Sequence, residues 1–238
     1  MRYGTPLVMA QIVRLNAEQH PVTAYEAEQY ARFGLTPMLV EARTPAEIIP
    51  HIAEADAVFA VSVSLPTVVI DAMRRCRVIS RMGTGTDKID VARATEQGIL
   101  VTNVPYFCVE EQADHAMAML LALVRKLPQM RVALEAGTFR YAHELMRTNQ
   151  RLPGRVLGLV GFGNSAQAMA RRARGFGMRV LATRRNLAAA QAEAAQMGVE
   201  LTDLATVVAE SDYVSLHLPL GPETYHLFDA AMLHKMKP

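Results

Sequence analysis

The stretch Val156-Leu-Gly-Leu-Val-Gly161-Phe-Gly163-Asn-Ser-Ala166 decides the fold of the second half of this chain. Its G-x-G-x-x-A pattern follows an apolar run typical of a strand, residues 156–161, and precedes a segment with helical periodicity, residues 165–175. In that context Gly161 permits a tight turn, Gly163 lets the backbone approach a diphosphate closely, and Ala166 keeps the helix near the sheet. The motif therefore predicts a dinucleotide site. The alternative is a strand-to-helix turn in which the glycines serve geometry alone.

The residues around this turn complete the predicted cofactor site. Asn164 and Ser165 begin the helix, where unpaired amides and the helix dipole receive phosphate charge. The next strand ends in Thr183 and is followed by Arg184-Arg185. A NAD site places an acidic acceptor about 20 residues after the motif, whereas two guanidinium groups suit a ribose 2′-phosphate. We therefore predict NADP over NAD; the alternative is a pair of solvated arginines.

The rest of the chain alternates short apolar runs with helical segments, the pattern of parallel sheets joined by crossover helices. The predicted strands of the first half span residues 7–13, 36–40, 57–63, 77–82 and 100–104. Its predicted helices span residues 45–55, 66–75, 89–97 and 109–126, the last ended by Pro128 and followed by a polar connection to about residue 152. The second half adds strands at 179–183 and 213–218 and helices at 187–196 and 204–210. The predicted domains are residues 1–104 and 105–238.

Composition excludes several classes of protein. Of the 238 residues, 51% are hydrophobic and 20% charged, with a formal net charge of +2, so the chain can bury a core and shows no electrostatic signature for nucleic acid or membrane. The longest apolar run, residues 116–124, is too short to span a bilayer. Cys76 and Cys108 carry no disulfide framework, and we expect a cytoplasmic protein without a metal site.

Four further blocks resemble the D-isomer-specific 2-hydroxyacid dehydrogenases, the family that includes phosphoglycerate, glyoxylate/hydroxypyruvate and formate dehydrogenases. The blocks are ISRMGTGTDKID (79–90), GILVTNVP (98–105), VEEQADHAMAMLLALVRK (109–126) and SDYVSLHLPL (211–220). The VEE-x-ADH run also resembles the C-terminal-binding-protein group of that family. The resemblance implies an α/β protein, in which a flavodoxin-like parallel-sheet substrate domain precedes an incomplete Rossmann dinucleotide-binding domain. It also implies a homodimer formed through the nucleotide domain and the long helix.

The resemblance assigns substrate residues to the first domain. Thr84 and Gly85 present backbone amides to a substrate carboxylate, because small residues let the main chain approach an anion closely. Ser62 and Val63 line the same cleft, and Asn103 matches the family's active-site asparagine. The alternatives are simple turn geometry for Thr84 and Gly85 and local capping by Asn103.

In the second domain the resemblance places His217-Leu218-Pro219 along the adenosine and bridging part of the cofactor. The chain departs from the family at Val109, where a threonine is common, and at Asp114, which replaces a glutamate.

The catalytic residues of the family are expected beyond Pro238. The family continues into a strand with N-x-x-R-G, then a glutamate and a catalytic histidine, and none of the seven histidines in this chain has a motif to replace them. We therefore predict no catalytic residue within the 238 residues and no activity of this chain alone. With only strands 1, 2 and 3 of the order 3-2-1-4-5-6, the strand at 156–161 is expected to become a sheet edge, covered by a missing remainder or by another protomer.

Two functions follow from these patterns, with an inert remnant of a truncated gene as a third reading. The first is an NADP-linked reductase of a small 2-keto acid, which transfers hydride from the nicotinamide to the keto carbon. The second is a non-catalytic dinucleotide-binding module that regulates or scaffolds partners.

Overall fold

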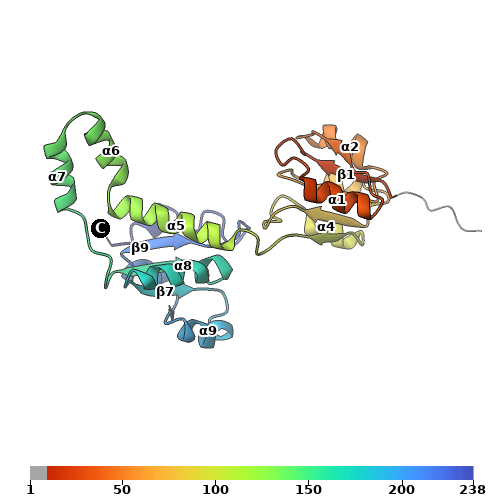
Figure 1. The fold of residues 1–238 in the computed structure, drawn as a ribbon. Helices are drawn as coiled ribbons and strands as arrows, with labels where there is room; N and C mark the ends of the chain where they lie inside the picture. Colours follow the sequence, from red (N-terminus) through yellow and green to blue (C-terminus); the bar gives the residue numbers. More distant parts are fainter. Residues whose placement is uncertain (1–9, 238) are drawn as a thin grey trace, which may run out of the picture. The chain divides into compact units, whose positions relative to one another are not determined.

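The computed structural model describes residues 10–237 (Figure 1), and the chain divides after residue 107 into two compact units. Each unit is a parallel β-sheet covered by helices, so the predicted α/β class is confirmed. The predicted domain boundary, between residues 104 and 105, lies just before this division.

The first unit contains a five-stranded parallel sheet with the order β2-β1-β3-β4-β5. This order is the flavodoxin-like one, in which the chain reverses direction across the sheet beside β1. Its strands are β1 (Ile12–Leu15), β2 (Met38–Val40), β3 (Ala57–Ala60), β4 (Val78–Arg81) and β5 (Leu100–Thr102). Its helices are α1 (Ala24–Arg32), α2 (Pro45–Ile52), α3 (Thr67–Asp71) and α4 (Val91–Glu96). The first predicted strand, residues 7–13, lies partly outside the described residues.

Helix α1 was not predicted, because none of its residues is buried and it carries no apolar stripe. Its start nevertheless has a sequence signal, since Thr23 and Glu26 form a capping box, as Thr44 and Glu47 do at the start of α2. In each box the threonine hydroxyl accepts from the backbone of the glutamate, whose carboxylate accepts from the backbone of the threonine. The capping boxes therefore determine where these two helices begin more than the helix propensities of their residues do.

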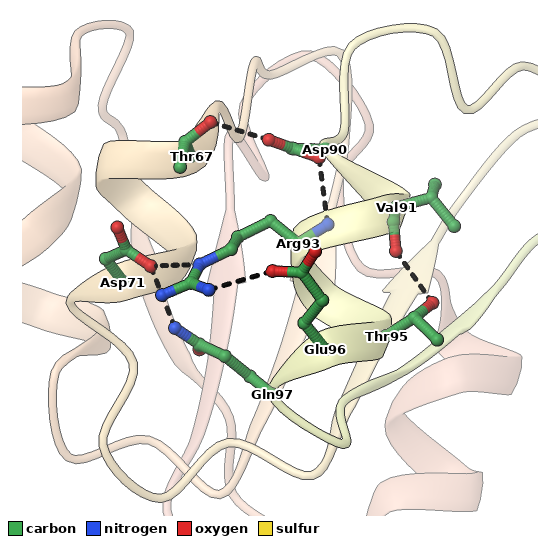
Figure 2. Close-up of polar contacts among 8 residues, drawn as sticks. All are labelled: Thr67, Asp71, Asp90, Val91, Arg93, Thr95, Glu96 and Gln97. Carbon is green, nitrogen blue, oxygen red and sulfur yellow. Dashed lines mark hydrogen bonds and ion pairs between the residues drawn. The ribbon is translucent and has the colours of Figure 1, made fainter.

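Polar contacts tie α3 to α4, as Figure 2 shows. Asp90 caps α4 by accepting from the backbone of Arg93 at 3.0 Å and also accepts from the Thr67 hydroxyl at 2.6 Å. The Arg93 guanidinium and the Gln97 amide both donate to Asp71, at 2.6 and 2.9 Å. These bonds hold the segment between β4 and α4, which carries predicted substrate residues, against the helices that cover the sheet.

A fully buried arginine lies in the middle of β1. Arg14 is 0% exposed, and its guanidinium donates to Glu26 at 2.6 Å, to the Tyr30 hydroxyl at 3.1 Å and to the His20 carbonyl at 2.6 Å. Burial raises the pKa of the Glu26 carboxyl, but hydrogen bonds from Thr23 and Arg14 outweigh it and lower that pKa below its ordinary value. The pair therefore joins α1 to the sheet as an ion pair.

The second unit contains a four-stranded parallel sheet with the order β8-β7-β6-β9. Its strands are β6 (Val156–Val160), β7 (Arg179–Thr183), β8 (Glu200–Leu201) and β9 (Tyr213–Leu216). Its helices are α5 (Val109–Val124), α6 (Leu127–Glu135), α7 (Phe139–Arg147), α8 (Asn164–Gly175), α9 (Gln191–Gln196), α10 (Leu204–Glu210) and α11 (Ala230–Leu233), with a 3₁₀ turn at Ala188–Ala190. Within this unit, α5 and α8 lie together against the sheet (Figure 1).

The expectation that the strand at 156–161 becomes a sheet edge is wrong. Strand β6 pairs with β7 on one side and with β9 on the other, so it is central. The error arose because β8 has only two residues, too few for a periodic signal, and the strand counted as third is the fourth. In the part of the chain that the structure describes, the edges are β8 and β9.

The connection predicted after Pro128 contains two helices instead. Helix α5 ends at Val124, and Lys126, with φ +53°, is the N-cap of α6. Pro128 lies in the first turn of α6, where proline is tolerated. Helices α6 and α7 pack against each other and extend beyond the end of α5, away from the sheet of this unit (Figure 1). Pro128, expected to stop the long helix, instead belongs to the start of the next one. Among residues 10–237, no helix is both long and apolar enough to cross a membrane.

Candidate cofactor and substrate sites

The glycine motif forms the predicted turn between β6 and α8. All five residues of β6 are buried, Gly161 has φ +101°, and Gly163 is the N-cap of α8. A Cβ on Gly161 would collide with the backbone carbonyl of His217, so both the conformation and the space there require glycine. A Cβ on Gly163 would meet nothing within 4 Å, so this glycine faces open space. Ala166 is fully buried.

The start of α8 lacks the side-chain cap that α1, α2, α4 and α10 have. Its first amides, those of Asn164 and Ser165, point from the positive end of a 12-residue helix. A hollow lined by Gly161, Gly163 and Asn164 lies beside them. Such an uncapped helix start next to open space can accept an anionic group.

The two predicted arginines follow β7 and line a neighbouring hollow of about 600 Å³ together with Gly161 and Thr183. They differ in their contacts. Arg185 donates to the Glu223 carboxylate at 2.9 Å, and both side chains are exposed. Arg184 has no hydrogen-bond or ion-pair partner among the described residues. No motif in the sequence signals Glu223, because it lies 38 residues away from Arg185.

His217 joins the end of β9 to the start of α8. Its backbone amide donates to Val160 at 2.8 Å, and its ring nitrogens lie 3.1 Å from the Ser165 hydroxyl and 3.0 Å from the Ser215 hydroxyl. Burial lowers the pKa of the His217 imidazole, so the ring is neutral at pH 7. His217 therefore contributes shape and hydrogen bonds, with Leu218 and Pro219 lining both hollows beside it.

Two of the predicted substrate residues, Thr84 and Gly85, lie in the turn after β4, and Asn103, which follows β5, contacts that turn. The Asn103 amide donates to the Thr84 carbonyl at 2.7 Å, and the Arg81 guanidinium donates to the Gly85 carbonyl at 3.2 Å. Arg81 also donates to the Met82 carbonyl at 2.7 Å, so it folds over the turn. These bonds rigidify the turn. Sequence reasoning missed Arg81, although it stands within the block that carries the resemblance.

The other two predicted residues, Ser62 and Val63, lie at the end of the neighbouring strand β3. They line a separate hollow of about 350 Å³ with Arg43 and Lys88, neither of which was predicted. Ser62 has φ +46°, an uncommon conformation for serine. In residues 10–237 no group of three or more His, Cys, Asp or Glu side chains could hold a metal ion.

Residues 117–238, more than half of the chain, match the family model for "D-isomer specific 2-hydroxyacid dehydrogenase, NAD binding domain". The chain belongs to this family. The resemblance drawn from the motifs is therefore confirmed, and the family consists of NAD(P)-dependent oxidoreductases of 2-hydroxy acids.

Relatives of known activity and structure agree with this membership. This dehydrogenase-family chain is 35% identical to the glyoxylate reductase of Thermococcus litoralis, covering 80% of this chain and 59% of that protein. It is 36% identical to the hydroxypyruvate reductase of Thermotoga maritima, covering 80% and 60%. The solved D-lactate dehydrogenase of Aquifex aeolicus, complexed with NAD and lactic acid, has a TM-score of 0.83 and 25% identity, covering 95% of this chain and 66% of that one. The chain thus spans about 60% of the curated relatives.

Proposed function

We propose that this family member binds NADPH in preference to NADH and that the whole protein reduces a small 2-keto acid such as glyoxylate or hydroxypyruvate. The observation that carries the proposal is the uncapped start of α8, with Gly163 facing open space, beside a hollow lined by Arg184. A diphosphate fits the uncapped helix start, and a ribose 2′-phosphate fits the hollow lined by Arg184.

The arginine contacts support NADP over NAD. Arg184 is free, among the described residues, to form charge-assisted hydrogen bonds with a 2′-phosphate, each worth about 1.5–3 kcal/mol. One such bond changes affinity by about tenfold or more. Arg185 is already paired with Glu223, so a phosphate would have to compete with that carboxylate for it. Exposed pairs of this kind are weak, so the competition is modest.

Isothermal titration of the variants with NADPH and NADH measures this difference. We expect Arg184→Gln to weaken NADPH binding about tenfold or more and to leave NADH binding nearly unchanged. Arg185→Gln should weaken NADPH binding less, because Glu223 already occupies part of that guanidinium. Arg179→Gln is the matched control, since Arg179 begins β7 at the opposite end of the strand and pairs with Glu200. Tighter binding of NADH than of NADPH by the unaltered chain would contradict the proposal.

In the proposed reaction, the amides of Thr84 and Gly85 hold the substrate carboxylate in a turn fixed by Asn103 and Arg81. The cofactor supplies hydride to the keto carbon. We assign this reaction to the whole protein, because the chain spans only about 60% of its relatives and the family's arginine, glutamate and histidine are expected outside the match. NADPH oxidation with a 2-keto acid separates this function from that of a non-catalytic binding module.

We also propose a homodimer formed through the nucleotide domain and its long helix α5, as the family resemblance implies, and we add α6 and α7 to the contact surface. Leu123, Val132 and Phe139 on these helices are 72, 59 and 65% exposed, so the second unit presents large apolar side chains there. Sedimentation equilibrium should show a dimer that Leu123→Lys with Phe139→Lys converts to monomer. Tyr25→Lys, on α1 and 70% exposed, is the control that should leave the dimer intact. A monomer before any substitution would contradict the proposal.

Neither cysteine forms a disulfide within the described residues, which agrees with the cytoplasmic location that we propose.

A further inference from the structure

The imidazole of His217 is held on both sides by hydroxyl groups. Its Nδ1 lies 3.1 Å from the hydroxyl of Ser165, at the start of α8, and its Nε2 lies 3.0 Å from the hydroxyl of Ser215, on β9. The backbone amide of His217 donates to the carbonyl of Val160, at the end of β6. The ring is therefore fixed between two strand ends and the first turn of the helix that follows the glycine motif.

Hydroxyl partners allow this ring to exist in either charge state. A serine hydroxyl has one donor and two acceptor lone pairs, and its hydrogen rotates to suit its neighbour. A neutral imidazole has one donating and one accepting nitrogen, whereas an imidazolium has two donors. Both Ser165 and Ser215 can turn to accept from an imidazolium. The ring can therefore gain a proton without losing a hydrogen bond and without any movement of the backbone.

The surroundings of His217 favour the neutral ring in the chain by itself. His217 lines the hollow beside the start of α8, together with Gly163 and Asn164. The other ionisable residues that line this hollow are Arg184, Arg185 and Glu193. Two guanidinium groups oppose a positive charge on the ring and one carboxylate favours it, so the lining as a whole disfavours the imidazolium. Burial acts in the same direction and lowers the pKa of the His217 imidazole.

A dinucleotide diphosphate reverses this balance, because it brings negative charge into the hollow. The proposed function places the diphosphate at the first amides of α8, which border the hollow that His217 lines. An anion close to an imidazole favours the charged form of the ring. We propose that His217 takes up a proton from solvent when the cofactor binds and holds the diphosphate as an imidazolium. This inference rests on the proposed function, and it couples cofactor affinity to pH.

The coupling has a definite direction. Cofactor affinity rises as pH falls through the pKa of His217 in the complex, and it levels off below the pKa of His217 in the free chain, which burial lowers. Each unit by which the bound diphosphate raises that pKa increases affinity by about tenfold at low pH relative to high pH. We therefore expect NADH to bind about fivefold or more tightly at about pH 6 than at about pH 8.

Calorimetric titration of the chain with NADH, in buffers of different ionisation enthalpy, measures the protons taken up on binding. NADH is the probe because the 2′-phosphate of NADPH itself titrates at about pH 6. We expect proton uptake by the unaltered chain and its loss in His217→Gln, whose amide keeps a donor and an acceptor but carries no charge. His234→Gln is the matched control, since His234 ends α11 in the same unit, is exposed and lines neither cofactor hollow. Equal uptake by the unaltered chain and His217→Gln would overturn the inference.

The nitrogen chemical shifts of the histidine rings test the same inference without a substitution. In a chain with ¹⁵N-labelled histidine, the ring that is missing from the His217→Gln spectrum should be neutral at about pH 7 and become charged when NADH saturates the site. Ser165→Ala should reduce this change, because it removes one of the two hydroxyls that accept from the charged ring. A ring that stays neutral in the complex would overturn the inference and leave the proposed function intact. Failure of both NADH and NADPH to bind would defeat the proposed function, and this inference with it.

Discussion

Replacing Gly161 by alanine is expected to abolish dinucleotide binding and to destabilise the second unit by about 2–4 kcal/mol. Two effects combine there. Alanine disfavours φ +101°, and its Cβ would collide with the backbone carbonyl of His217, which cannot swing away as a flexible side chain could. Because His217 is held to Val160 and to the start of α8, relieving the collision would separate β9 from the glycine turn.

Gly154→Ala is the matched control for the backbone conformation. Gly154 has φ +82° and precedes β6, but a Cβ there would meet nothing within 4 Å. This variant should therefore lose only about 1 kcal/mol, the contribution of the conformation itself. Urea unfolding followed by amide exchange in β6 measures both variants. Equal destabilisation by the two substitutions would show that the contact with His217 is unimportant.

Gly163→Ala separates cofactor binding from turn geometry. The site is open and its φ of −94° suits alanine, so the second unit should remain as stable as before. The new methyl group would stand where the diphosphate approaches, and we expect NADPH affinity to fall at least tenfold. Unchanged affinity would favour the alternative in which the glycines serve geometry alone.

Replacing Glu26 by alanine is expected to destabilise the first unit by about 3–5 kcal/mol, because it leaves Arg14 charged and buried without its partner. Glu26→Gln should lose less, since an amide retains the capping box and a hydrogen bond to the guanidinium. The free energy of unfolding follows from the urea dependence of amide exchange in β1, with β6 as an internal reference.

Glu47→Ala is the matched control, because the Thr44–Glu47 box has the same geometry at the start of α2 but an exposed glutamate with no arginine side chain bonded to it. It should lose only about 1 kcal/mol. Combining Arg14→Met with Glu26→Gln should lose less than the sum of the two single variants, since no lone charge is left buried. Strict additivity would contradict the buried ion pair.

The ion pair between Arg14 and Glu26 also predicts that the stability of the first unit depends on pH. The folded pKa of Glu26 lies below the ordinary value of 4.5 for a free glutamate, so its contribution to stability is complete above that pH. As pH falls through the lowered folded pKa, the carboxylate is protonated and the contribution is lost. The difference in stability between the unaltered chain and Glu26→Gln should therefore shrink below about pH 4.

Local patterns determined much of this protein. The strand, turn and helix at 156–166, the arginines after β7 and the alternation of strands with helices all rest on contacts within a few residues, which leave a period or a motif in the sequence. The family membership was predicted from such motifs. The two-residue β8 and the exposed α1 were not predicted, because neither has a hydrophobic periodicity that the sequence could show.

Tertiary structure alone decided the pairs that join distant segments. Arg14 with Glu26, Arg185 with Glu223, and the meeting of Arg43 with Lys88 depend on which strand ends become neighbours. Even the central place of β6 was settled by its pairing with β9. The sequence alone does not distinguish a buried, a paired and a free arginine or lysine, because the environment of each side chain is made by residues far along the chain.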